Sequence, residues 1–232
     1  MRNTSARESF SQHNQTWKKE WNSVIFTNEK KFNLDGPDGY KYYWHQLGSN
    51  YQHYSKRAFG GKSLMVWAGF AFGGKMELQF ISNRLNAKGY QSLLQSANII
   101  DQGTLIAGEN FKLMHDRAPP HAVSLIFKIK VFSYLKYLSQ AQSTQKWLAD
   151  NDISLLKWCA MSPDLNPMEN LWAILSRRVY ANGKQYNTVV DLKDSIKKEW
   201  DAINDDTLVD LINSMPDRIF QLIQTKGKAI KY

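Results

Sequence analysis

The chain has 232 residues, of which 43% are hydrophobic and eight are tryptophan, so it can bury a large core in one folded domain. Its net charge of +9 favours a polyanionic partner, with a basic protein that has no nucleic-acid role as the alternative. This composition excludes an intrinsically disordered chain, and the single cysteine, Cys159, excludes an internal disulfide. We expect no secretory signal in the polar residues 1–15, and no apolar stretch predicts a membrane span.

The first elements are predicted from side-chain alternation. Residues 8–22 predict a polar helix, and residues 23–34 predict a strand. One face of this strand carries Val24, Phe26, Asn28, Lys30 and Phe32. Residues 35–39 hold two glycines and a proline, which is typical of a turn, and the aromatic residues 40–44 suit a second strand.

The middle of the chain predicts a hairpin followed by a helix and a strand. Residues 64–72 are apolar on both faces, as in a buried central strand, and the Gly73–Gly74 pair can return the chain through residues 76–81. Asn86 can cap a helix, one face of which carries Tyr90, Leu93, Leu94 and Ala97. Residues 110–115 then predict another strand.

Helices dominate the second half. Residues 141–150 predict a helix and residues 153–158 a strand, after which Cys159 should pack as a small hydrophobe. Asn166 and Pro167 are the preferred cap and first residue of a helix that we expect to run to about residue 180.

A further helix should start at Thr188, and an apolar stripe from residue 208 to 223 should break near Pro216 and end at Gly227. Strands therefore come first, strands and helices then alternate, and helices close the chain. This order predicts an α/β fold in which helices cover a mixed sheet.

Three polar residues stand out within these elements. Asp116 follows the strand at residues 110–115, Glu169 lies in the first turn of the helix that Asn166 caps, and Asn28 lies on the strand at residues 23–34. Taken singly, each has an ordinary explanation: a turn residue, a capping-box glutamate and a bystander that forms hydrogen bonds. Taken together, acidic residues at strand and helix ends can hold the divalent cations that promote phosphodiester cleavage.

Sequence motifs around these residues favour the combined interpretation. The motifs are Ser162–Trp172 (Ser-Pro-Asp-Leu-Asn-Pro-Met-Glu-Asn-Leu-Trp), Lys30–Gly39, Met65–Trp67, Met215–Phe220 and Ile230–Tyr232. In this order they resemble the catalytic domain of Tc/mariner-type DDE transposases, most closely the branch of the Tc-three element. The resemblance runs from about residue 20 to the last residue.

The resemblance implies an RNase H-like domain at residues 23–232 that cleaves DNA and transfers strands during transposition in the nucleus. It implies Mg²⁺ or Mn²⁺ at a two-metal site, DNA as partner, and a second copy or an intact transposase as a protein partner. Asp116 matches the second catalytic aspartate and Glu169 the third acidic residue, which makes both of them metal ligands. Asn28 stands where the first catalytic aspartate is expected.

Asn28 is the first departure from the family pattern. Its amide can approach a cation but brings no negative charge, so we expect weaker metal binding and impaired catalysis. Glu29 is a poor substitute, because neighbouring residues of a strand point to opposite faces.

The second departure is an expected insertion at residues 123–140, which lengthens the separation between Asp116 and Glu169. Its Ile, Phe, Lys, Tyr and Leu bias resembles a short AT-rich intron translated in frame, and the alternative is a genuine structural arm.

The third departure is at the amino terminus. Residues 1–22 are too few for the family's DNA-recognition domains, so we interpret them as a remnant of the linker.

Two alternatives to a transposase catalytic domain remain open. One is a non-catalytic DNA- or partner-binding module that interferes with an intact transposase, and the other is an unstable relic. Other enzyme classes are disfavoured, because the sequence contains no glycine-rich phosphate loop, no zinc-type Cys/His spacing and no G-x-S-x-G motif.

Overall fold

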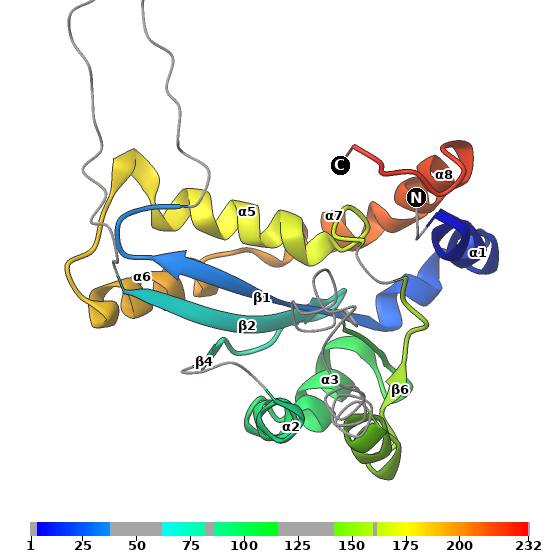
Figure 1. Cartoon of the computed structure of the whole chain (residues 1–232), viewed down its shortest axis with the longest axis horizontal. Helices are drawn as coiled ribbons and strands as arrows, with labels where there is room; N and C mark the ends of the chain where they lie inside the picture. Colours follow the sequence, from blue (N-terminus) through cyan, green and yellow to red (C-terminus); the bar gives the residue numbers. More distant parts are fainter. Residues whose placement is uncertain (1–3, 38–61, 82–85, 116–141, 160–161, 232) are drawn as a thin grey trace, which may run out of the picture.

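A mixed six-stranded sheet forms the centre of the molecule (Figure 1). The computed structural model describes residues 4–37, 62–81, 86–115, 142–159 and 162–231. Its strands are β1 (Val24–Asn33), β2 (Ser63–Ala71), β3 (Gly74–Lys75), β4 (Gln79–Ile81), β5 (Lys112–Met114) and β6 (Ser154–Leu155). They are arranged in the order β3-β2-β1-β5-β6, and β4 also pairs with β2.

The two neighbours of β1 run in opposite directions. β2 pairs with β1 antiparallel, with Asn28 opposite Ala68, whereas β5 pairs with β1 parallel, with Phe26 opposite Met114. β6 continues the parallel half of the sheet beside β5. The carboxyl ends of β1, β5 and β6 therefore point the same way, which is the arrangement that collects side chains from distant parts of a sequence at one edge.

Helices cover both faces of the sheet (Figure 1). They are α1 (Thr4–Asn14), α2 (Ala87–Ser96), α3 (Ile99–Ala107), α5 (Pro167–Val179), α6 (Val189–Asp201), α7 (Asp205–Asn213) and α8 (Met215–Gln224), with a further helical stretch at residues 142–150. Short 3-10 turns lie at Lys19–Ser23 and Ala181–Gly183. None of the helices within these described ranges is long and apolar enough to cross a membrane.

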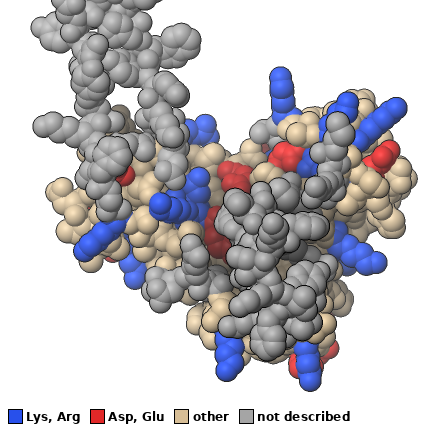
Figure 2. Space-filling model, in the orientation of Figure 1, with Lys and Arg blue, Asp and Glu red and all other residues tan. Residues whose placement is uncertain are grey.

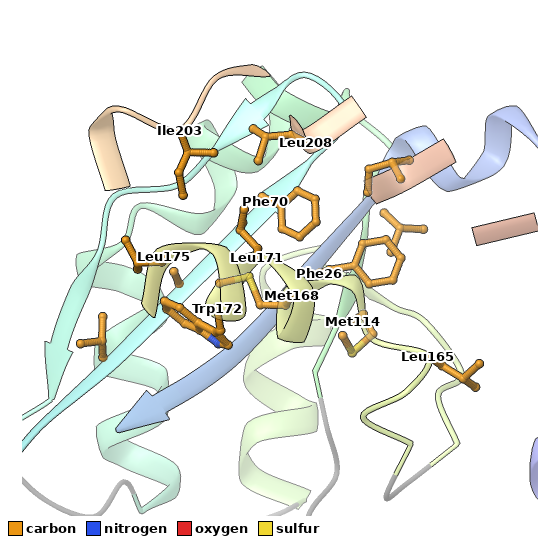
Figure 3. Packing of buried hydrophobic residues seen from close by; sticks show 14 of the residues in the cluster. Phe26, Phe70, Met114, Leu165, Met168, Leu171, Trp172, Leu175, Ile203 and Leu208 are labelled. Carbon is orange, nitrogen blue, oxygen red and sulfur yellow. The ribbon is translucent and has the colours of Figure 1, made fainter. Parts of the chain in front are cut away.

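Side chains on the two faces of β1 pack into two separate hydrophobic cores. Phe26 packs with Phe70 and with Met168 and Leu171 of α5, as Figure 3 shows. Ile25 belongs to the second core, which α2, α3 and residues 142–150 cover. Asn28 is two residues beyond Phe26 and so lies on the α5 face of the strand.

Most predicted boundaries are confirmed where the structure describes them. Asn86 and Thr188 cap α2 and α6 with their side chains, and the apolar stripe at residues 208–223 is divided between α7 and α8, with Pro216 at the start of α8. The predicted strand at residues 40–44 and the insertion at residues 123–140 lie outside the described residues.

One predicted helix has other bounds than expected, and one helix was missed. Residues 8–22 do not form one polar helix: α1 begins at Thr4 and ends at Asn14, a 3-10 turn follows, and Phe10 and Trp21 are both buried. α3 was not predicted at all. It contains Gly103, where a Cβ atom would lie 2.7 Å from the ring of Phe111, so the glycine permits the helix to approach that ring.

Candidate active site

Asn28 of β1 and Glu169 of α5 are in direct contact. The Nδ2 group of Asn28 donates a hydrogen bond of 2.7 Å to Oε1 of Glu169, across 141 residues of sequence. The other end of the amide, Oδ1, accepts the backbone N–H of Glu29 at 2.9 Å. Both side chains are partly buried, so the contact lies at the surface of the α5 core rather than inside it.

The start of α5 places Glu169 at this position. Oδ1 of Asn166 accepts the N–H of Met168 at 3.0 Å, and Pro167 occupies the first turn, as the sequence predicted. The capping-box interpretation of Glu169 was wrong, because the backbone N–H of Asn166 bonds instead to the carbonyl of Pro163. The carboxylate is thus free of a capping role and faces β1.

A second hydrogen bond ties the same turn of α5 to β1. Nδ2 of Asn166 donates to the carbonyl oxygen of Thr27 at 3.3 Å, and Oγ1 of Thr27 donates to the carbonyl of Met114 at 2.8 Å. Residue 27 is therefore linked to α5 on one side and to the end of β5 on the other. This arrangement fixes the backbone beside Asn28 relative to Glu169.

The third predicted site residue, Asp116, lies outside the described residues. The described part of β5 ends with Met114, followed by His115, whose ring centroid lies 5.8 Å from that of Tyr90. Within the described ranges, no group of three or more His, Cys, Asp or Glu residues could hold a metal ion. The structure thus brings together two of the three predicted residues and leaves the metal site a prediction.

Glu29 lies on the side of β1 that faces α2. Burial raises the pKa of the Tyr90 hydroxyl, and the negative charge of Glu29 raises it further. Glu29 lies four residues beyond Ile25 of the second core and so shares its face of β1, whereas Asn28 faces α5. The expectation that Glu29 cannot take the place of residue 28 is consistent with this geometry.

Sequence reasoning missed a group of residues that anchors the loop before α5. Arg7, Asp164, Asn170 and Arg218 are joined by hydrogen bonds around this loop. Asp164 and Asn170 belong to the Ser162–Trp172 motif and could have been suspected. Arg7 carries no sequence signal, because its partner is 157 residues away.

Basic and acidic side chains are both exposed on the face shown in Figure 2. Figure 2 shows Lys and Arg side chains around much of the visible face, with some Asp and Glu side chains nearer its centre.

A separate cavity of about 450 Å³ lies at the carboxyl-terminal end of α5, where Arg177 and Lys184 help to line it. This cavity is at the opposite end of the helix from Glu169 and is not part of the candidate site.

Comparisons with known proteins show what the chain is similar to. No family model matches the chain. It is 40% identical over 212 residues to the transposable element Tc3 transposase of Caenorhabditis elegans, which covers 91% of this chain and 59% of that protein. It is 26% identical over 235 residues to the Tcb2 transposase of Caenorhabditis briggsae, covering all of this chain and 78% of the relative. The chain thus spans less than two thirds of the Tc3 relative's length.

Solved structures show the same fold. The catalytic domain of Mos1 mariner transposase superimposes with a TM-score of 0.70 at 16% identity, over 99% of this chain and 96% of that one. The Mos1 paired end complex with Mn gives a TM-score of 0.78 at 17% identity, over 98% of this chain and 63% of that one. The predicted RNase H-like mixed sheet flanked by helices is confirmed.

Proposed function

The chain is a homologue of the Tc-type transposases and has the fold of the mariner transposase catalytic domain, and from this we propose that it is a DNA-transposing catalytic domain impaired at position 28. The reaction class is phosphodiester cleavage and strand transfer on DNA. Relatives solved as a complex with a transposon end and as a complex with Mn support DNA and a divalent cation as its partners. We propose that the protein acts on this substrate in the nucleus.

The contact between Asn28 and Glu169 is the observation that carries this proposal. A site for divalent cations needs acidic oxygens that converge from separate elements, and Glu169 converges with residue 28. At the same place, the N–H group of an amide occupies one oxygen of that carboxylate. This contact supports our proposal that position 28 is that of the first catalytic residue and that its amide, in place of a carboxylate, bonds to Glu169.

The residues fit a divalent cation only in part. Glu169 supplies a carboxylate, and Asp116 would supply a second if it joins the same edge of the sheet. Asn28 supplies no charge, and its Oδ1 is engaged by the N–H of Glu29. Two divalent cations bound side by side repel each other, and only two carboxylates would offset this repulsion where the family pattern has three. We therefore propose that metal binding is weakened at this site.

Loss of one charge at a metal-dependent site should be costly for the reaction. A thousandfold lower rate corresponds to about 4 kcal/mol of additional barrier, which is the size of effect that we propose for Asn28. We also propose that the segment at residues 123–140 is an insertion, derived from an intron, that disturbs the site further. We propose that Lys and Arg side chains of this domain contact the phosphate backbone of DNA, as the net charge of +9 favours.

DNA nicking by the wild-type chain and its variants tests the proposal. Supercoiled plasmid is incubated with Mn²⁺ and either the wild-type chain or Asn28→Asp, each with and without residues 123–140. We expect Asn28→Asp to nick about a thousandfold faster, and Asn28→Asp/Glu169→Gln to lose this gain because a ligand is missing. Equal nicking by the wild type and Asn28→Asp would contradict the proposed impairment.

A non-catalytic DNA-binding module is the second candidate function. The net charge of +9 favours it, because neutralised phosphates release counterions. Salt-sensitive retention of DNA by the wild-type chain and by Asn28→Asp, without nicking by either protein, would support this candidate. Co-purification with an intact transposase would add the interfering role.

A further inference from the structure

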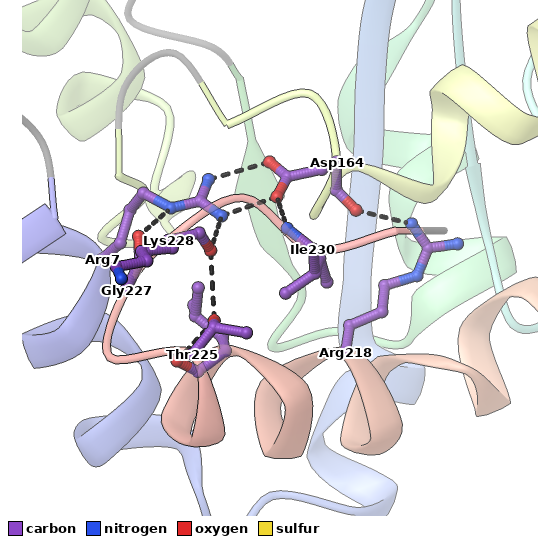
Figure 4. Close-up of polar contacts among 8 residues, drawn as sticks. Arg7, Asp164, Arg218, Thr225, Gly227, Lys228 and Ile230 are labelled. Carbon is purple, nitrogen blue, oxygen red and sulfur yellow. Dashed lines mark hydrogen bonds and ion pairs between the residues drawn. The ribbon is translucent and has the colours of Figure 1, made fainter.

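The guanidinium group of Arg7 joins three segments that are far apart in sequence (Figure 4). Its two Nη atoms donate to the two carboxylate oxygens of Asp164 at 2.8 and 2.6 Å, while Nε donates to the carbonyl of Gly227 at 2.9 Å. Nη2 also reaches the carbonyl of Lys228 at 3.2 Å. The side chain of Arg7 is 6% exposed and that of Asp164 is 17% exposed, so the pair is largely removed from water.

Asp164 is the point at which these segments meet. Its Oδ2 also accepts the backbone N–H of Ile230 at 2.9 Å, and its backbone carbonyl accepts a hydrogen bond of 3.0 Å from Arg218 of α8. Burial alone would raise the pKa of Asp164, but the contacts with Arg7 and the N–H of Ile230 hold that pKa below its usual range. The charged carboxylate of Asp164 therefore binds residues near both ends of the described chain, Arg7 and Ile230.

Hydrogen bonds also hold residues on either side of Glu169, one through Arg218 and one through Asn166. Arg218, which holds the carbonyl of Asp164, also donates to Oδ1 of Asn170 at 2.8 Å. Asn166, two residues after Asp164, is tied to the carbonyl of Thr27. Glu169 thus lies between two anchored positions on the first turn of α5.

We propose that Arg7 is a positioning residue for Glu169, acting through Asp164 on the loop that begins α5. This inference rests on the proposed function, since it assigns Arg7 a role in orienting a residue of the candidate site. Arg7 touches neither Glu169 nor Asn28, and its effect is on where the first turn of α5 lies. A planar guanidinium suits this role, because its fork matches the two oxygens of a carboxylate while Nε serves a third acceptor.

Hydrogen exchange of the whole chain tests the positioning without any metal or activity. Arg7→Ala removes every contact of the guanidinium, and Arg7→Lys restores the charge but not the fork. Lys19→Ala is the control, because it removes one charge at an exposed position. We expect peptide amides in residues 165–171 to exchange about tenfold faster in Arg7→Ala, less so in Arg7→Lys, and at the wild-type rate in Lys19→Ala. Faster exchange confined to α1 and residues 225–231 would overturn the proposal.

A metal titration in the Asn28→Asp background then tests the consequence for the site. We expect Arg7→Ala to raise the Mn²⁺ concentration for half-maximal nicking by about tenfold, with partial rescue in Arg7→Lys, as for other residues that orient metal ligands. Unchanged Mn²⁺ dependence would also overturn the role of Arg7. If no Asn28→Asp protein nicks DNA, the proposed function fails, while hydrogen exchange still decides whether Arg7 positions α5.

Discussion

The side-chain amide of Asn28 donates to the carboxylate of Glu169 over 2.7 Å, so strand β1 and helix α5 are joined at the candidate site without a cation. A carboxylate at position 28 would instead face Glu169 with a like charge. The residue to which we assign the proposed impairment therefore also contributes a hydrogen bond between β1 and α5. Stability and metal dependence should change together when this residue is replaced.

Asn28→Asp should make the stability of the protein depend on Mn²⁺. Without metal, the loss of the hydrogen bond and the new repulsion should cost about 2 kcal/mol, or about 4–8 °C in Tm. Saturating Mn²⁺ should recover about this amount through its binding to the folded state. Thermal unfolding in EDTA and in Mn²⁺ measures both effects. Asn28→Ala is the control, since it loses the hydrogen bond but should gain no response to metal.

Asn166→Ala should destabilise the protein more than Thr188→Ala, although both remove a helix cap. Thr188 is an exposed cap worth about 1 kcal/mol, whereas Asn166 is 3% exposed and also donates to the carbonyl of Thr27. We expect a cost of about 2–3 kcal/mol for Asn166→Ala in urea unfolding, because a buried acceptor also loses its partner. Equal costs would show that the link to β1 contributes nothing.

Asp164 should make stability fall in acid. Because its pKa is depressed in the folded state, its contribution is complete above the unfolded pKa of about 3.9 and is lost as pH falls through the lower folded value. Urea unfolding from pH 6 down to pH 3 should give a steeper decline for the wild type than for Asp164→Asn. Asp150→Asn, which changes an exposed carboxylate, should retain the wild-type slope.

Gly227→Ala should be more damaging than Gly183→Ala. Both glycines have positive φ, +75° and +73°, so each alanine should carry about 1 kcal/mol of backbone strain. A Cβ atom at residue 227 would also collide with the backbone carbonyl of Thr4, whereas the space at residue 183 is open. The total for Gly227→Ala should reach about 3 kcal/mol, measured by chemical unfolding. Equal losses of unfolding free energy in the two variants would mean that α1 can move away from the added Cβ atom without destabilising the protein.

Local signals predicted the helix that carries Glu169, but not its partner. Asn166 and Pro167 mark the start of α5 in any context, because cap and first-turn preferences are properties of a few adjacent residues. The apolar run of β2 is equally local. The pairing of Asn28 with Glu169 spans 141 residues and was expected only from the family resemblance.

Other features could not be predicted because their causes lie elsewhere in the fold. α3 includes Gly103 and several β-branched residues, all weak helix formers, and packing near Phe111 compensates for them. The first helix was expected to be a polar remnant, yet Arg7 and Phe10 are buried against other segments. Burial of a charged residue depends on its partner, and nothing near Arg7 in the sequence indicates Asp164.

The hydrogen bond between Ile230 and Asp164 has a consequence for synthesis of the protein. β1, β5 and α5 all leave the ribosome before Ile230 does, so a growing chain carries them without the contact that completes the environment of Asp164. The first turn of α5 then reaches its final place late, after translation has passed residue 230. Ribosome-bound chains halted after α5 should therefore protect this turn poorly from proteases.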